Sequence, residues 1–353
     1  MRVALTGGTG YVGAFATKAL LDAGHEPRLL VRDPAKLATK LGALGVGAAP
    51  LDVVVGDMTD RAAVEELVTG CDAAIHAAAS VEVLNRSDAQ RTIETNVGGT
   101  RNVVDAALAA GCDPVVHVSS VAVFGTRPAA PVVTADLEPA TASDNPYGRS
   151  KALAEQFARE HQAAGDPVVI VYPGGVTGPG VAGSYGELAQ GFVSMLKAGA
   201  LVTGDGGFGV IDVRDLASVF VAILEPGRGP RRFMAGGVPM RLPEVAAVIR
   251  QITGRRFPVL PIPGAVFRGL GHVTDAVRRV VPFDTVFTAE AMETLTLARP
   301  TDDSAVHQQL GVAYRDPVET IEASLRALHA GGALEARHVG VLASPGSRSA
   351  ARG

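Results

Sequence analysis

Thr6-Gly7-Gly8-Thr9-Gly10-Tyr11-Val12-Gly13 is the stretch of this 353-residue sequence that decides its fold. It follows a short apolar run at residues 2–5 and precedes a helical pattern of apolar residues. Gly7 permits a tight turn, Gly10 lets a pyrophosphate approach the backbone, and Gly13 lets the helix pack closely on the strand. The order of strand, glycine turn and helix therefore predicts a dinucleotide-binding unit, with the phosphates at the N-terminus of the helix.

A second strand is predicted at residues 26–31, and Arg32 and Asp33 follow it directly. A carboxylate at this position usually bonds the ribose hydroxyls of NAD, whereas an arginine can pair with the 2′-phosphate of NADP. Arg32 therefore favours NADP(H) as the cofactor. Asp33 could instead serve as the ribose carboxylate, which keeps NAD(H) as a possible cofactor.

A second motif, Asn145-Pro146-Tyr147-Gly148-Arg149-Ser150-Lys151, places a phenol and an ammonium group one helical turn apart. Pro146 would take the first position of a helix, so Tyr147 and Lys151 would share one helix face. A lysine beside a tyrosine favours the phenolate and brings the tyrosine pKa toward the working pH. The pair predicts a group that hands a proton to a carbonyl oxygen.

With both motifs present, the chain resembles the extended short-chain dehydrogenase/reductase family (the NAD-dependent epimerase/dehydratase superfamily). Its pattern is closest to the dihydroflavonol-reductase-like and 3β-hydroxysteroid-dehydrogenase-like members. The resemblance implies an α/β Rossmann fold, with a doubly wound parallel sheet and a smaller C-terminal substrate-binding domain. The predicted nucleotide domain covers residues 1–172, with 206–224 returning to it, and the substrate-binding region covers 173–205 and 225–330.

The resemblance also implies the site residues. Ser120 matches the catalytic serine, and Tyr147 and Lys151 match the catalytic pair, with Lys151 also bonding the nicotinamide ribose. Asp57 would contact the adenine amino group, and Met58 would lie against the adenine ring. The full set of implied cofactor-binding residues is Thr6, Gly7, Gly10, Tyr11, Val12, Gly13, Arg32, Asp57, Met58, Ala77, Ala78, Ala79, Tyr147, Lys151, Pro173, Gly174 and Val176.

The chain departs from the family pattern at Tyr172, where members commonly have an arginine before the proline. We expect this change to alter the floor of the pocket. Asn96 matches an asparagine whose role is mainly structural. The substrate pocket is expected to be mostly apolar, with Val81, Phe124 and Tyr185 on its border.

These residues predict hydride transfer from the nicotinamide of NADPH to a ketone or aldehyde carbon. Tyr147 would protonate the oxygen, and Ser120 would polarise the carbonyl. The apolar pocket favours a fairly bulky carbonyl or alcohol substrate. A nucleotide-sugar epimerase or dehydratase is the alternative, which Arg127, Arg231 and Arg232 keep open, and a non-catalytic NADP-binding regulator is a third.

Composition argues against several other classes of protein. A net charge of -4 and a pI near 6.1 give no basic surface for nucleic acid. Cys71 and Cys112 are not in a Cys-x-x-Cys spacing, so we expect no disulfide framework and a cytoplasmic location. We also expect no targeting or membrane-spanning segment, and the dispersed histidines predict no metal site.

The last residues of the chain, 331–353, are rich in glycine, alanine and serine. This composition predicts a flexible tail that is unrelated to catalysis. Family members often pair through the helices that contain Asn96 and Tyr147, so the resemblance makes a homodimer possible.

Overall fold

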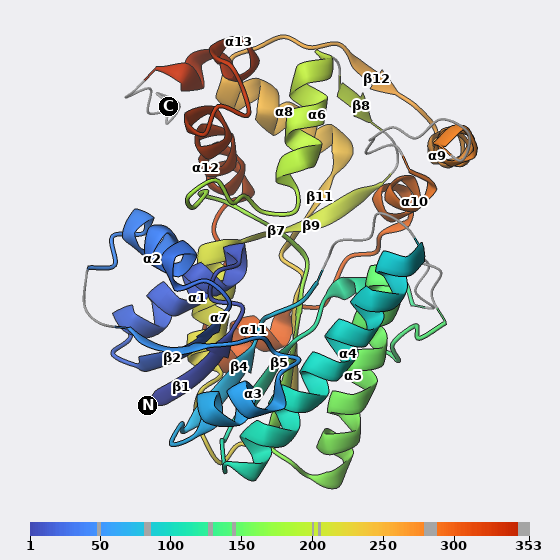
Figure 1. The fold of residues 1–353 in the computed structure, drawn as a ribbon. Helices are drawn as coiled ribbons and strands as arrows, with labels where there is room; N and C mark the ends of the chain where they lie inside the picture. The colour runs from blue at the N-terminus through green and yellow to red at the C-terminus, as the bar shows by residue number, and fades with distance from the viewer. Residues whose placement is uncertain are drawn as a thin grey trace.

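A seven-stranded parallel sheet forms the centre of the larger part of the molecule (Figure 1). The computed structural model describes residues 1–47, 51–80, 86–125, 130–142, 146–199, 201–203, 206–278 and 288–344. The strand order is β10-β6-β5-β4-β1-β2-β3, and neighbouring strands are parallel. The strands are β1 (Arg2–Thr6), β2 (Glu26–Val31), β3 (Asp52–Val55), β4 (Ala73–His76), β5 (Val115–Val118), β6 (Val168–Pro173) and β10 (Arg231–Ala235).

Helices cover both faces of this sheet. In β1, Val3 and Leu5 point into one core and Ala4 into the other, because successive side chains of a strand point to opposite faces. This arrangement confirms the predicted doubly wound α/β fold. The first core includes residues of α1 (Tyr11–Asp22), α2 (Pro34–Ala43), α7 (Val213–Ala222) and α11 (Ser304–Leu310), and the second includes residues of α3 (Arg61–Val68), α4 (Arg86–Ala109), η1 (Val121–Phe124) and α5 (Pro146–Ala164).

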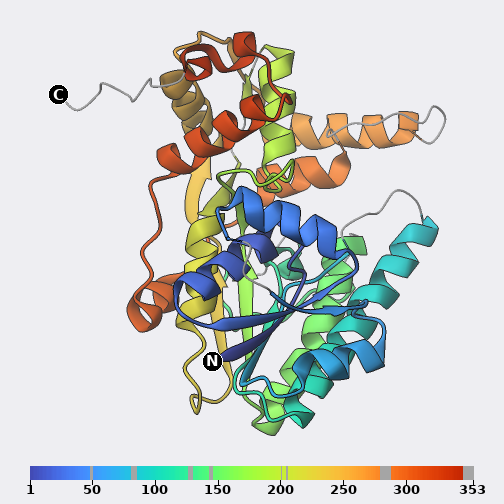
Figure 2. The same cartoon turned by 60° about the vertical axis from the view of Figure 1, so that its left-hand side comes forward.

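The smaller part of the molecule lies beyond the carboxyl ends of these strands (Figure 1). A three-stranded sheet, a two-stranded sheet and several helices build it around a third core. Figure 2 shows α9 and α10 side by side at its margin. Its elements are β7 (Gly175–Thr177), α6 (Ala189–Ala198), β8 (Leu201–Thr203), β9 (Gly207–Asp212), β11 (Val238–Arg241), α8 (Leu242–Thr253), β12 (Val259–Pro261), α9 (Gly264–Arg278), α10 (Ala289–Leu297), α12 (Pro317–Ala330), α13 (Ala336–Val339) and η2 (Gly340–Ala343).

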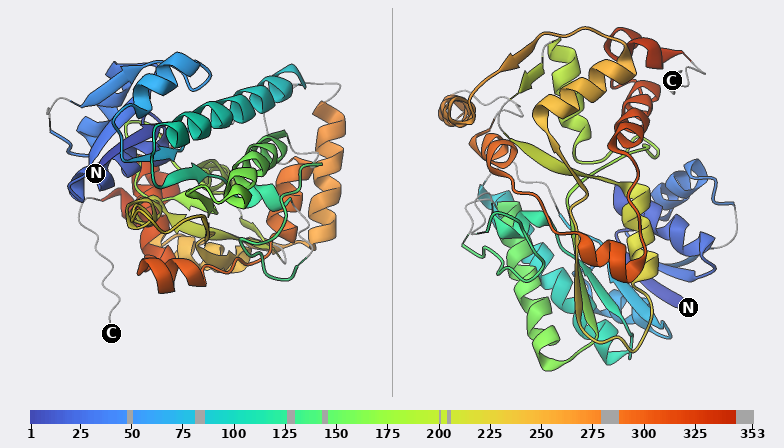
Figure 3. Two further views of the ribbon diagram at one scale, coloured as in Figure 1. Left: turned by 90° about the horizontal axis from the view of Figure 1, so that it is seen from below. Right: turned by 180° about the vertical axis from the view of Figure 1, so that it is seen from behind.

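The chain passes between the two parts more often than the predicted boundaries allow. Residues 206–224 were expected to return to the nucleotide domain, but β9 pairs with β7 and β11 in the small sheet. The elements that pack on the large sheet are α7, β10 and α11, seen from behind in Figure 3. Strand pairing joins residues far apart in sequence, so a local pattern cannot show which sheet a strand enters.

Residues 331–344 correct the prediction of a flexible tail. Leu334, Val339 and Leu342 are buried in the third core, together with residues of α8 and α12. The Leu334 carbonyl also accepts a hydrogen bond from His329 Nδ1 at 2.8 Å. Small residues dominate the composition here, but the few apolar side chains between them are enough to hold the segment. Residues 345–353 lie outside the described part of the chain.

Among the helices of the described residues, none combines the length and the apolar character that crossing a bilayer requires.

Replacing Leu334 by Ala should lower the free energy of unfolding by about 2 to 5 kcal/mol, because it leaves a cavity in a packed core. Leu334 is only 1% exposed. Chemical denaturation followed by circular dichroism measures the change. Val341→Ala is the control: Val341 is 53% exposed in the same segment, and its loss should stay within about 0.5 kcal/mol. Equal stability of the Leu334→Ala variant would show that the segment does not contribute to the core.

Candidate active site

The predicted site residues gather at the carboxyl ends of the parallel strands. They follow β1, β2, β4, β5 and β6, and they face the smaller part of the molecule. β1 lies between β2 and β4, so the chain leaves β1 and β4 toward opposite edges of the sheet. Such a switch point opens a crevice in which α/β proteins bind ligands.

The glycine turn fits a pyrophosphate. Gly7 has a φ of +84° and accepts a hydrogen bond from the Gly10 amide at 2.8 Å. A methyl group on Gly13 would lie 2.1 Å from the Gly7 carbonyl oxygen, so only glycine allows this approach. Gly10 caps α1 without a side-chain hydrogen bond. The first amides of α1 are thus free of a side-chain cap and can receive an anion.

The small residues after β4 lie against the glycine turn. A methyl group on Gly7 would lie 2.8 Å from the Ala78 amide nitrogen, with Ala77 equally close. Thr6 holds this turn, because its hydroxyl oxygen accepts a hydrogen bond from the Ala78 amide at 3.2 Å. His76, beside Thr6, is buried, and burial together with the charge of Lys151 lowers its pKa to about 3. It is therefore a neutral residue of the interior.

Arg32 is the exposed cation at the end of β2. Its side chain is 82% exposed, and its guanidinium lies 3.7 Å from the Asp57 carboxylate. The neighbouring Asp33 caps α2, because its carboxylate accepts hydrogen bonds from the Ala35 and Lys36 amides. Arg32 therefore remains the group at this strand end that can move toward a ligand.

The predicted adenine contacts, Asp57 and Met58, follow β3. Asp57 accepts hydrogen bonds from the Thr59 amide at 3.0 Å and from its hydroxyl at 2.7 Å. Met58 is buried and packs so closely on α4 that a methyl group on Gly99 would lie 2.7 Å from its sulfur. The loop after β3 is thus fixed by its own contacts. Both residues lie near Arg32 at the same end of the sheet.

Ser120, Tyr147 and Lys151 come together beside β5. Tyr147 lies in the first turn of α5, which begins at Pro146 as the sequence predicts. It forms a hydrogen bond with Ser120, which caps η1 just after β5. Lys151, one turn along α5, is buried and donates a hydrogen bond from Nζ to the Val118 carbonyl at 2.6 Å.

Burial decides the protonation of this group. It raises the pKa of Tyr147 above its ordinary value, and the hydrogen bond with Ser120 opposes the rise. It lowers the pKa of Lys151 to about 8, against the opposing effect of Glu155 and Glu187. We expected Lys151 to bring the pKa of Tyr147 down. Burial dominates instead, and the group that lowers the pKa of Tyr147 is Ser120, while the Lys151 ammonium donates to the Val118 carbonyl.

Glu187 is a charged residue that sequence reasoning missed. The residue is exposed, although the surrounding atoms desolvate its carboxylate enough to raise its pKa. Its charge raises the pKa of both Tyr147 and Lys151. Glu187 is thus close enough to act electrostatically on the predicted catalytic pair. It follows a loop with no motif, so the sequence carried no signal for it.

A buried polar network lies below the catalytic pair. Glu155 accepts hydrogen bonds from Ser119 Oγ at 2.6 Å, from Arg159 Nε at 2.8 Å and from the Tyr172 hydroxyl at 2.9 Å. Tyr172 is fully buried in this network, so it does not form a pocket floor. Glu155 and Arg159 continue the four-residue spacing of Tyr147 and Lys151. That spacing is the sequence signal that could have identified them.

Two of the three predicted pocket residues have other neighbours. Phe124 is buried in the second core, with its ring 5.2 Å from that of Tyr172. Tyr185 packs on Gly180 and on Gly331, at the end of α12. Both side chains therefore serve packing, which the apolar sequence pattern could not distinguish from a pocket wall. Val81 lies outside the described residues.

The residues after β6 that were predicted to bind the cofactor pack closely on other segments of the protein. Pro173 ends β6, and a methyl group on Gly174 would lie 2.1 Å from the Gly236 carbonyl oxygen. Val176 is buried in β7.

Asn96 has the structural contacts that the sequence predicts. Its side-chain oxygen accepts a hydrogen bond from the Ser80 amide, and its side-chain nitrogen donates one to the Ser80 carbonyl.

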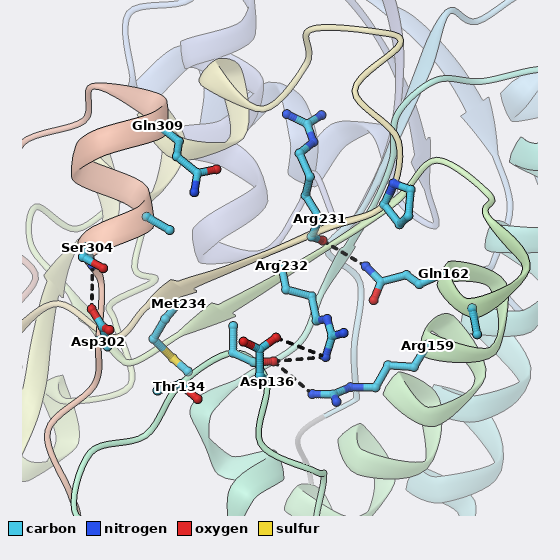
Figure 4. Close-up of a pocket in the computed structure, with 14 residues that line it drawn as sticks. Thr134, Asp136, Arg159, Gln162, Arg231, Arg232, Met234, Asp302, Ser304 and Gln309 are labelled. Atoms are coloured by element: carbon cyan, nitrogen blue, oxygen red, sulfur yellow. Dashed lines mark hydrogen bonds and ion pairs between the residues drawn. The ribbon is translucent and has the colours of Figure 1, made fainter.

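A cavity of about 510 Å³ opens at the far edge of the sheet (Figure 4). Arg231 and Arg232 line it at the start of β10, opposite Val169 and Ile170. The site residues follow the other end of these strands. The two arginines bond backbone carbonyls, those of Ile223 and Glu225 for Arg231 and that of Ala135 for Arg232. They therefore do not converge on the crevice, and Arg127 lies outside the described residues.

Known proteins are similar to this chain in sequence and in fold. The family model described as "NAD dependent epimerase/dehydratase family" matches residues 3–236. "Sterol demethylase protein B" of Methylococcus capsulatus is 28% identical over 88% of this chain and 93% of its own length. A "Putative dihydroflavonol 4-reductase" of Synechocystis sp. is 31% identical over 73% of this chain and 74% of its own length.

A solved structure agrees with these likenesses at the level of the fold. The UDP-glucose-4-epimerase of Stenotrophomonas maltophila, with bound NAD, superposes with a TM-score of 0.74 at 21% identity. The superposition covers 94% of this chain and 99% of the epimerase. With its glycine turn, its strand switch point and a family model that matches about two thirds of its length, the chain belongs to the NAD-dependent epimerase/dehydratase family of extended short-chain dehydrogenases/reductases.

Proposed function

We propose that the protein is an NADPH-dependent reductase that interconverts a carbonyl and an alcohol on a fairly bulky, mostly apolar substrate. The hydrogen bond between Tyr147 and Ser120 carries the proposal. It brings two hydroxyl groups to the same place in a crevice, with the Lys151 ammonium one helical turn away. Two donors that converge on one point suit the oxygen of a carbonyl group.

The names of several relatives support this class of substrate. They include the dihydroflavonol 4-reductase named above and a 3-beta-hydroxysteroid dehydrogenase of Mycolicibacterium neoaurum, 28% identical over 74% of this chain. The compounds in these names are polycyclic and largely apolar. We infer a substrate of the same general character.

The residues of the site would hold the cofactor at three points. The uncapped N-terminus of α1 receives the pyrophosphate, Arg32 reaches the adenosine ribose, and Lys151 bonds the nicotinamide ribose hydroxyls. When bound, NADPH supplies the hydride for the carbonyl carbon. The protein supplies orientation and the proton.

The protonation of the site suits reduction. Tyr147 keeps its proton at neutral pH because burial raises its pKa, so the phenol is ready to donate to a carbonyl oxygen. Ser120 donates a hydrogen bond to the same oxygen and stabilises its growing negative charge. After the transfer, the Ser120 hydroxyl donates a hydrogen bond to the phenolate and stabilises it. In the reverse direction the phenolate accepts the proton of an alcohol.

The exposure of Arg32 supports NADP(H) over NAD(H). Its nearest acidic partner, Asp57, is 3.7 Å away and itself partly exposed, so the ion pair is weak and a 2′-phosphate can compete for the guanidinium. Asp33, the other candidate for the ribose, is engaged as the cap of α2.

NADPH consumption, followed optically, tests the proposal against aromatic ketones, steroids and nucleotide sugars. We expect oxidation of NADPH with at least one apolar ketone. Epimerised product without net consumption of cofactor would instead support a nucleotide-sugar epimerase. Tight NADPH binding with no turnover of any compound would support a regulator.

Changing Tyr147 to Phe should reduce turnover roughly a hundred-fold or more, because it removes the proton donor. The ring remains, so the dissociation constant of NADPH should change little. Steady-state rates and fluorescence titration of NADPH measure the two quantities. A variant that turns over at the normal rate would refute the role of Tyr147.

Replacing Arg32 by Ala should weaken NADPH binding about ten-fold or more and leave NADH binding nearly unchanged, because a charge-assisted contact to the 2′-phosphate is lost. Titration of both cofactors measures the ratio. Arg61→Ala is the control, since Arg61 pairs with Glu65 on the outside of α3. Equal losses for the two cofactors would count against the phosphate contact.

The value of kcat/KM for NADPH should fall as the pH rises through about 8. This parameter reports ionisations of the free enzyme, in which Lys151 is charged below about pH 8 and neutral above it. Tyr147 does not ionise in this range, because its pKa is raised. A Lys151→Arg variant keeps its charge and should lose the inflection, even at a lower rate. A flat wild-type profile from pH 7 to about 9 would contradict the assignment.

A further inference from the structure

One face of α5 carries a row of four polar residues. Tyr147, Lys151, Glu155 and Arg159 are four residues apart, so they lie above one another along the helix. The first two belong to the proposed reaction. Of the other two, Glu155 is fully buried and Arg159 is partly buried, and their helix packs on the second core.

Glu155 is a carboxylate with no exposed surface. Burying an ionised carboxylate is costly unless hydrogen bonds and an opposite charge compensate it. Here Ser119, Tyr172 and Arg159 donate to its two oxygens over 2.6 to 2.9 Å. Each donor lowers the pKa of Glu155 against the rise that burial causes. An apolar side chain of similar size would fill the same space without the desolvation cost of a carboxylate.

The donors come from the segments that form the site. Ser119 lies between Ser120 and Val118. The Val118 carbonyl accepts the hydrogen bond from the Lys151 ammonium. Tyr172 immediately precedes Pro173 and the loop expected to carry the nicotinamide. One carboxylate on α5 is therefore bonded to the ends of both β5 and β6.

Arg159 closes the network on the side of the solvent. Its guanidinium donates to the Leu137 carbonyl at 2.7 Å, to the Tyr172 hydroxyl at 3.0 Å and to the Ala135 carbonyl at 3.2 Å. Figure 4 shows it in the wall of the cavity at the far edge of the sheet. It supplies the cation that a carboxylate in this position requires. An arginine at position 172, as the resemblance would lead one to expect, would supply the same charge from β6.

We propose that Glu155 is a positioning residue for the reaction described above: its carboxylate fixes α5 against the ends of β5 and β6 and places a countercharge one helical turn from the Lys151 ammonium. The inference rests on the proposed function for its catalytic consequence. Its electrostatic consequence can be measured without any substrate.

The effect of Glu155 on Lys151 has a direct physical basis. The two residues are one helical turn apart, and the negative charge of Glu155 raises the pKa of Lys151 while burial lowers it. Glu187, in the segment before α6, adds to the rise. The other titratable neighbours, His76 and His117, are neutral because burial lowers their pKa values. Without the negative charge of Glu155, burial should lower the pKa of Lys151 further.

The first experiment follows the Lys151 side chain by NMR, using protein labelled with ¹³C at lysine Cε. The sequence has few lysines, at positions 18, 36, 40, 151 and 197, and Lys151→Arg identifies the signal. The titration midpoint should lie near pH 8 in the wild type and lower in Glu155→Gln. Glu160→Gln is the control, since Glu160 is exposed on the same helix. An unchanged midpoint in folded Glu155→Gln would overturn the countercharge role.

The second experiment compares two tyrosines that each donate to a buried carboxylate. Tyr172 bonds Glu155 at 2.9 Å, and Tyr314 bonds Asp303 at 2.8 Å, outside the proposed machinery. Tyr172→Phe and Tyr314→Phe should lower the melting temperature similarly. Only Tyr172→Phe should lower kcat, by about ten-fold, with the dissociation constant of NADPH changed less than about two-fold, since small displacements at a reacting centre cost rate.

The outcomes separate the two proposals. Equal falls in kcat for both tyrosine variants, or no fall in Tyr172→Phe, would reduce the network to a structural role. If the wild type reduces no compound at all, the proposed function fails, and the Lys151 titration still decides whether Glu155 acts on the site. Tyr172→Phe keeps the ring that packs on Phe124, so it provides a readout even if Glu155→Gln does not fold.

Discussion

The architecture depends on how closely three backbone segments meet at the switch point of the sheet. Gly13 lies against Gly7, and Gly7 lies against the turn formed by Ala77 and Ala78. Any side chain at these two glycines would separate the start of α1 from the strand ends. Because neither glycine has a side chain, the uncapped amides of α1 and the end of β4 border one crevice. Crevices of this kind are where α/β proteins bind ligands, and the proposed pyrophosphate contacts lie there.

A second constraint is the burial of ionisable groups on α5. Lys151 and Glu155 lie one turn apart in an environment that disfavours charge, and each is held by named partners. Such groups are destabilising in a core unless complete hydrogen bonding offsets their desolvation. The same bonds join the helix to β5 and β6. The hydrogen bonds that satisfy Lys151 and Glu155 thus also fix the position of α5 relative to the sheet.

The smaller part of the molecule is held by side chains from distant segments. α6, α8, α12 and residues 331–344 share one core, although they are widely separated along the chain. The chain enters and leaves this part several times. For example, β10 belongs to the large sheet, although β9 and β11, which precede and follow it in the sequence, belong to the small one. The segment after β7 carries Glu187, whose charge raises the pKa of both residues of the proposed catalytic pair.

The sequence by itself determined the class of fold and the identity of the central motifs, because both depend on local spacing. Glycines at a strand–helix turn and a tyrosine four residues before a lysine have the same meaning wherever the rest of the chain goes. The tertiary structure decided what depends on contacts between distant residues. It joined Ser120 to Tyr147, buried Phe124, Leu334, Val339 and Leu342, placed Arg231 and Arg232 away from the crevice, and surrounded Glu155 with donors. Burial and pairing are properties of the neighbours that a residue acquires on folding, and no local pattern specifies them.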